Sequence, residues 1–127
     1  MGYKYYNPNP LKKAVEDCTV RAISKAFDIS WNQADIELFS YGFSMKDVQN
    51  SSAVFAAFLR EHGYMLYGLP LSCPNCYTIR DFCNEFPNGT YIVATGSHVV
   101  TVVDGDYYDA WDSGSEVPAY FWTKEEI

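Results

Sequence analysis

The chain has 127 residues, of which 48% are hydrophobic and 20% charged, a composition typical of one folded domain and not of a disordered or fibrous chain. Nine basic residues stand against sixteen acidic ones, so the formal net charge is −7. Nucleic acid and anionic membranes bind concentrated basic surfaces, so neither is expected as a partner. We therefore expect a single domain over residues 1–127.

The first part of the chain predicts an extended segment followed by a helix. Two prolines make residues 5–10 extended and turn-forming, because proline disfavours helix in the residue before it. The first helix is expected to begin at Asp17 or Cys18 and to end at Phe27, with Asp17 as its N-cap. Val20, Ile23 and Phe27 lie at helical spacing on one face.

Further helices and a strand follow before a change of periodicity at residue 90. Ser30 is expected to cap a second helix that runs to about Phe39, and residues 50–52 precede a third helix that ends before Gly63. The remaining elements of this part are a strand over residues 64–69 and a short helix over residues 78–85.

The last third of the chain predicts β-structure. Short runs rich in β-branched and aromatic residues are separated by glycine-containing turns, which indicates an antiparallel meander. The expected strands are residues 90–95, 98–103, 107–111 and 117–122. Helices first and strands afterwards predict an α+β domain, with the N-terminal helices packed on one side of a C-terminal antiparallel β-sheet.

One cysteine stands at the expected start of the first helix. The partial positive charge of a helix N-terminus favours the thiolate form, so Cys18 is placed to act as a nucleophile. The alternative is that Cys18 is a small buried apolar residue, as most free cysteines are.

A cysteine nucleophile needs a base, and His98 stands at the start of a predicted strand. A three-residue hairpin loop over residues 104–106 places His98 opposite Asp112, which would accept the imidazole Nδ1 proton. In the same register Asp109 lies opposite Thr101 on the other face, so it is rejected as the partner of His98. A two-residue loop would shift this pairing by one residue and is expected to present Ser113 instead of Asp112.

Three motifs carry a resemblance to a known family: Glu-Asp-Cys-Thr-Val-Arg-Ala at 16–22, Gly-Ser-His-Val-Val at 96–100 and Tyr-Asp-Ala-Trp-Asp-Ser at 108–113. Over residues 5–123 the chain resembles a minimal papain-like cysteine peptidase. It is similar to C39-type bacteriocin-processing peptidases and to small bacterial and phage proteins with Asp-Cys-x-x-Arg-Ala.

The resemblance implies a papain-like fold and a thiol hydrolase, a peptidase or isopeptidase acting on a peptide or protein substrate through a thioester. It implies Cys18 as the nucleophile, His98 as general base and acid, and Asp112 as the residue that orients His98. No cofactor is expected. The alternative is a binding or regulatory protein, for instance that of a phage, that keeps the fold without the activity.

The chain departs from the family at the oxyanion hole, the group of hydrogen-bond donors that stabilises the negative oxygen of the intermediate. Papain-like enzymes place a glutamine about six residues before the cysteine, and here that position is Lys12. Asn7 and Asn9 could supply a side-chain amide instead, and Asn9 is preferred because it is nearer to Cys18. Turn formation is the stronger explanation for both asparagines.

The remaining cysteines have the spacing of half a zinc site. Cys73 and Cys76 form a close pair and Cys83 adds a third thiol, but the second pair that a structural zinc site needs is missing. His62, the possible fourth ligand, is explained by its place at a helix end. No metal is expected, although a small zinc-stabilised interaction protein stays as a third hypothesis.

The cellular setting follows from the N-terminus. Residues 1–13 contain no apolar core of a secretion signal, and no stretch reaches the roughly 20 apolar residues of a membrane span. We therefore expect a cytoplasmic protein with reduced thiols and no membrane contact. The sequence does not indicate an oligomeric state.

Overall fold

The structure is a computed structural model that describes residues 2–127. The helices are α1 (Cys18–Phe27), α2 (Trp31–Met45), α3 (Ser52–Glu61) and α4 (Ile79–Glu85). The strands are β1 (Gly2–Tyr5), β2 (Met65–Gly68), β3 (Thr90–Ala94), β4 (Val99–Val103), β5 (Asp106–Asp109) and β6 (Tyr120–Thr123). Every helix and strand expected from the sequence is present, and the α+β class is confirmed. The largest difference in bounds is at α2, which continues to Met45 beyond its expected end at about Phe39.

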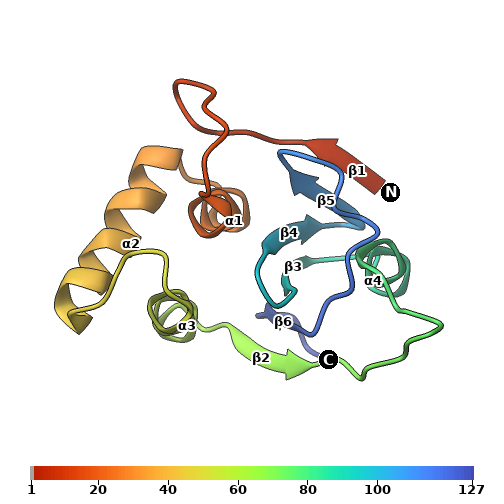
Figure 1. Cartoon of the computed structure of the whole chain (residues 1–127). Coiled ribbons are helices and arrows are strands. Elements are labelled where there is room, and N and C mark those ends of the chain that lie inside the picture. The colour runs from red at the N-terminus through yellow and green to blue at the C-terminus, as the bar shows by residue number, and fades with distance from the viewer. Residues whose placement is uncertain (1) are drawn as a thin grey trace.

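The strands form one mixed sheet in the order β1-β5-β4-β3-β6-β2 (Figure 1). The strands from β3 to β6 pair antiparallel, as predicted, and β2 joins β6 at one edge. The predicted meander is wrong for its last strand, because β6 pairs with β3 and not with its chain neighbour β5. The purely antiparallel prediction is wrong at the other edge, where β1 pairs with β5 in parallel. The N-terminal segment therefore supplies a strand that the sequence pattern did not indicate.

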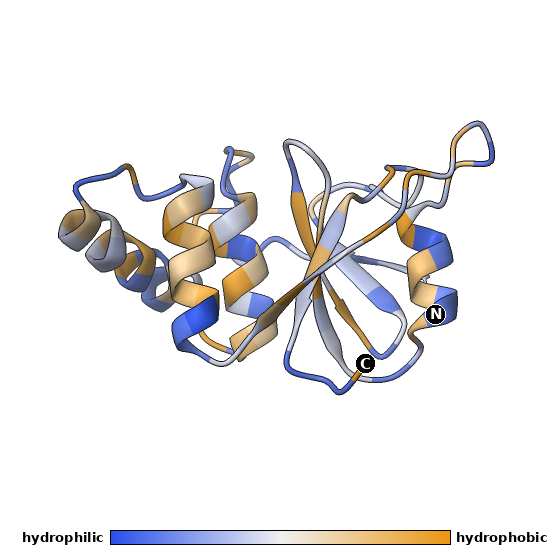
Figure 2. Ribbon diagram, turned by 90° about the horizontal axis from the view of Figure 1, so that it is seen from below, coloured by the Kyte–Doolittle hydropathy of each residue, from blue (hydrophilic) through white to orange (hydrophobic). Residues whose placement is uncertain are grey.

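Helices cover both faces of the sheet, with α1, α2 and α3 on one side and α4 on the other (Figures 1 and 2). Alternate residues of β3 point to opposite faces, as the pleat of a strand requires. Ile92 belongs to the core with α1–α3, and Val93 to the core with α4. The expectation that all helices pack on one side is thus wrong for α4.

Side chains cap the starts of three helices, and of these caps Ser30 was predicted from the sequence. Ser30, Ser51 and Thr78 each accept a hydrogen bond from a backbone N–H in the first turn of α2, α3 and α4. Asp17 does not cap α1 with its side chain, because its carboxylate is hydrogen-bonded to Arg21 and Trp31. Asp17 thus occupies the predicted N-cap position, but its carboxylate bonds to side chains and not to the helix backbone.

The hairpin between β4 and β5 decides which residues face the candidate site. Its loop contains two residues, Asp104 and Gly105, and both have positive φ angles, of 49° and 81°. Asp-Gly favours this two-residue turn, in which both central residues are left-handed. Thr101 consequently pairs with Tyr108, so the predicted three-residue loop and its register are wrong by one residue.

Candidate active site

Cys18 is the first residue of α1, and that helix packs against β4. The thiol is half-buried. Burial alone raises the pKa of the thiol. Two kinds of interaction lower this pKa overall: hydrogen bonds from His98 and from the backbone N–H of Val99, and the positive charges of His98 and Arg21. The surroundings of Cys18 therefore favour the thiolate.

His98 is held by the turn that joins β3 to β4. Its backbone N–H donates to Thr95 Oγ1 at 3.1 Å, and its carbonyl accepts from the Thr95 N–H at 2.8 Å. The ring of Trp111 lies against the imidazole, with centroids 5.0 Å apart. The imidazole Nε2 lies 2.7 Å from Asp109 Oδ2, which leaves Nδ1 to face the sulfur of Cys18. The nitrogen roles are the reverse of those expected.

The charge of His98 complements that of Cys18. Burial lowers the pKa of the imidazole, but its hydrogen bonds to Asp109 and Cys18 and the negative charges of both outweigh burial and raise this pKa to about 9. A lowered thiol pKa beside a raised imidazole pKa favours a thiolate–imidazolium pair at neutral pH. Such a pair is a nucleophile with its proton donor already in place.

Asp109 is fully buried and is the residue that orients His98. Its carboxylate also accepts from Arg21 Nη2 at 2.9 Å, from the Ala110 N–H at 2.8 Å and from the Ser113 hydroxyl. Burial raises its pKa, but the bonds from His98 and Ser113 and the charges of His98 and Arg21 lower the pKa overall. Asp109 therefore stays ionised next to the imidazole.

Arg21 connects this carboxylate to the start of α1. It is buried, and its Nη1 lies 2.6 Å from Asp17 Oδ1, while the other oxygen of Asp17 accepts from Trp31 Nε1 at 2.8 Å. The Arg21 guanidinium thus joins the start of α1, through Asp17, to the end of β5, through Asp109. This contact explains the motif Asp-Cys-x-x-Arg, in which Asp17 and Arg21 stand at helical spacing on either side of Cys18 in the sequence.

The structure does not bring Asp112 to His98. Asp112 has a side-chain exposure of 46%, and both its oxygens accept from Arg80 Nη2, at 3.0 and 3.1 Å. One of them also accepts from the Tyr107 hydroxyl. The orienting position predicted for Asp112 is held by Asp109, the residue rejected from the assumed register. The two-residue loop that the sequence left as an alternative is the signal that could have corrected this choice.

Asn9 makes turn contacts instead of the predicted oxyanion contact. Its side-chain oxygen accepts from the Leu11 N–H at 2.8 Å, and its own N–H donates to Asn7 Oδ1. Lys12 has a positive φ of 55° in the same turn. Asn9 lines neither of the cavities at Cys18, whereas Asn50 lines both. The Asn50 amide makes no hydrogen bond within residues 2–127 and was not found from the sequence.

Two cavities meet at Cys18 and His98. The α3 cavity, of about 290 Å³, is bounded by residues of α3, β2, β6 and the turn before His98. The α1 cavity, of about 470 Å³, extends past the start of α1 toward Trp111. The two cavities therefore leave open space on both sides of Cys18.

The other cysteines have structural positions. A disulfide joins Cys73 and Cys76, so the expectation of reduced thiols is wrong for this pair, which also removes two of the zinc ligands considered. Cys83 is buried against the sheet, and burial raises its thiol pKa to about 11. His62 Nδ1 lies 2.7 Å from the Phe58 carbonyl. No cluster within residues 2–127 contains three side chains suited to hold a metal ion.

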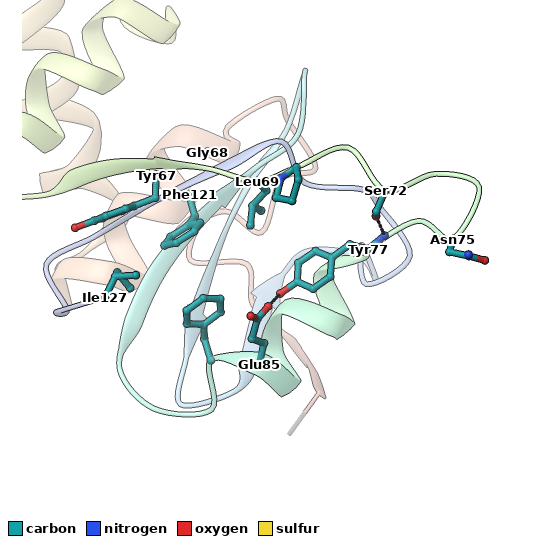
Figure 3. A pocket seen from close by; sticks show the side chains of 11 residues that line it. Tyr67, Gly68, Leu69, Ser72, Asn75, Tyr77, Glu85, Phe121 and Ile127 are labelled. Atoms are coloured by element: carbon teal, nitrogen blue, oxygen red, sulfur yellow. Dashed lines mark hydrogen bonds between the residues drawn. The ribbon is translucent and has the colours of Figure 1, made fainter.

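A separate cavity of about 470 Å³ lies on the α4 side of the sheet (Figure 3). Aromatic rings of Tyr67, Tyr77, Phe86 and Phe121 line it, and Glu85 accepts a hydrogen bond from Tyr77 at its edge. It contains no histidine and no free thiol. The groups that can carry covalent chemistry are therefore gathered at Cys18.

Comparison with protein-family models, with curated proteins and with solved structures found no match to this chain. None of the helices within residues 2–127 combines the length and the hydrophobicity needed to cross a membrane.

Proposed function

We propose that this chain is a papain-like thiol hydrolase that cleaves a peptide or isopeptide bond. The observation that supports the proposal most is the contact of Cys18 with His98, together with the 2.7 Å bond from His98 to the buried Asp109. Nucleophile, base and orienting carboxylate stand in the order that a covalent thiol mechanism needs.

The first half of the proposed reaction forms a thioester. The Cys18 thiolate attacks the carbonyl carbon, and the carbonyl oxygen gains the negative charge. The imidazolium of His98 then gives its proton to the leaving amine as the C–N bond breaks. The acyl group stays on the sulfur, and His98 is left neutral.

The second half releases the acyl group. Neutral His98 takes a proton from water, the hydroxide attacks the thioester carbon, and the C–S bond breaks to give a carboxylic acid and the Cys18 thiolate. The negative oxygen faces the backbone N–H groups at the start of α1, which have no partner within the helix. The amide of Asn50, at the edge of both cavities, is the side-chain donor available there.

The test is cleavage of a pool of internally quenched peptides by matched variants. Cys18→Ala and His98→Ala should each lower the rate by about 10³-fold or more, as removal of a nucleophile or its base does. His62→Gln is the control and should keep the wild-type rate, since His62 bonds only to a helix carbonyl and to neighbouring rings. Equal rates for wild type and Cys18→Ala would overturn the proposal.

The second candidate is a binding protein that keeps the fold, favoured by Lys12 in place of the family glutamine and by the aromatic cavity on the α4 side. In that case Cys18 would be no more reactive than an ordinary thiol. Mass-spectrometric mapping of iodoacetamide adducts at mildly acidic pH separates the two, because a hydrolase requires preferential labelling of Cys18.

A further inference from the structure

Arg60 is a cation without an acidic partner at the candidate site. It lies in the last turn of α3, is exposed, and borders the same α3 cavity as Cys18 and His98. Its guanidinium carbon lies 5.2 Å from the centroid of the Trp122 ring. It forms no ion pair with a carboxylate within residues 2–127. Acidic residues outnumber basic ones in this chain, whose net charge is −7, yet this arginine beside the proposed nucleophile has no carboxylate partner in the described part of the chain. Its position therefore calls for a functional explanation.

The two cavities at Cys18 differ in charge. No aspartate or glutamate lines the α3 cavity, whose other walls include Phe55, Leu66 and Trp122. The α1 cavity contains Glu16, which makes no ion pair within residues 2–127, and the pair of Asp17 with Arg21. In the α3 cavity the charges of Cys18 and His98 complement each other, so Arg60 is the one further charged side chain among the described residues that line it, and no carboxylate of that cavity offsets its charge.

We propose that the α3 cavity is a subsite for a substrate residue that carries a carboxylate, bound by Arg60. The inference rests on the proposed function and specifies the substrate class of that site. A guanidinium held against an aromatic ring is pre-organised to bind a carboxylate through two hydrogen bonds. The apolar walls contact the aliphatic part of such a residue. The carboxylate of the substrate is that of an aspartate or glutamate side chain or that of a C-terminus, and both would bind Arg60 in the same way.

A pair of matched alkylating reagents tests the subsite without a known substrate. N-iodoacetyl-glutamate α-amide and N-iodoacetyl-glutamine α-amide differ only in one carboxylate. In both, the Cys18 thiolate displaces iodide and forms a thioether. We expect the glutamate reagent to alkylate wild-type Cys18 about three- to fivefold faster, the ratio that a partly exposed ion pair gives. N-iodoacetyl-glycine and its amide test a chain-end carboxylate in the same way.

Variants of Arg60 identify the source of the preference. Arg60→Gln should abolish it, Arg60→Lys should retain part of it, and Arg60→Glu should favour N-iodoacetyl-arginine amide instead. Lys4→Gln, a neutralised cation on exposed β1, is the control and should behave as wild type. Thermal unfolding of each variant shows whether it is folded.

The outcomes separate this inference from the proposed function. Equal rates for the acidic and neutral reagents in wild type, or a preference that survives in Arg60→Gln, would overturn the subsite even if Cys18 reacts rapidly. A Cys18 that is no more reactive toward iodoacetamide than an ordinary thiol would overturn the hydrolase, whatever the ratio of the paired reagents.

Discussion

The two faces of the sheet use their polar residues in different ways. On the α1 side, Arg21, Asp17 and Asp109 are buried and bonded to one another beside Cys18. On the α4 side the interior is filled by aromatic rings, and the Arg80–Asp112 pair lies half exposed at its edge. Buried charges are costly and seldom the best way to stabilise a core. Their concentration around one thiol therefore points to function, whereas packing accounts for the aromatic interior of the α4 side.

The difference between the two faces predicts its largest effect on catalysis, at Asp109 on the α1 side compared with Asp112 on the α4 side. Asp109→Asn should lower kcat for peptide cleavage by about 10²- to 10⁴-fold with little change in KM, because the imidazole loses the carboxylate that orients and charges it. Asp112→Asn should leave kcat within about twofold. The measurement is steady-state kinetics of both variants on one peptide. A greater loss in Asp112→Asn would restore the predicted role of Asp112.

A smaller effect is expected on stability, at the arginine of each face. Arg21→Gln leaves Asp17 and Asp109 buried without a compensating charge, so it should lower the free energy of unfolding by about 3 to 5 kcal/mol. Arg80→Gln is the matched control, and it should change stability little because its ion pair is half exposed. Urea unfolding of both variants measures the difference, and similar losses would contradict the distinction between the faces.

The sequence predicted local structure well because its signals are local. The capping residues Ser30, Ser51 and Thr78 and the glycine turns fix where elements begin and end, and the structure agrees with them. Pairing between distant segments leaves no comparable pattern. Strand β1 pairs with β5, about one hundred residues later in the chain. The residue pattern of so short a segment does not indicate a strand unless the strand that it pairs with is known.

The candidate site could be predicted only in part, because some of its residues are indicated by local signals and others depend on pairing between distant segments. Cys18 was found from its position at a helix start, and His98 from its position before a strand. The carboxylate was misassigned because a single residue of loop length reverses which side chains share a face. The Asp-Gly pair at 104–105 favours the shorter loop, and weighting that preference would have directed attention to Asp109. The partners of Arg21 could not be inferred, since they depend on how α1 packs on the sheet.

The central claim is that Cys18 and His98 form a thiolate–imidazolium pair, and the pH dependence of Cys18 alkylation by iodoacetate tests it most directly. The lowered pKa of Cys18 means that the thiolate exists below the ordinary thiol range, and the raised pKa of His98 means that the imidazolium persists to about pH 9. The rate should therefore rise at a pH below the range of an ordinary thiol and fall again near pH 9, as His98 loses the charge that attracts the reagent. A single rise at the pKa of an ordinary thiol, with no fall near pH 9, would contradict the account.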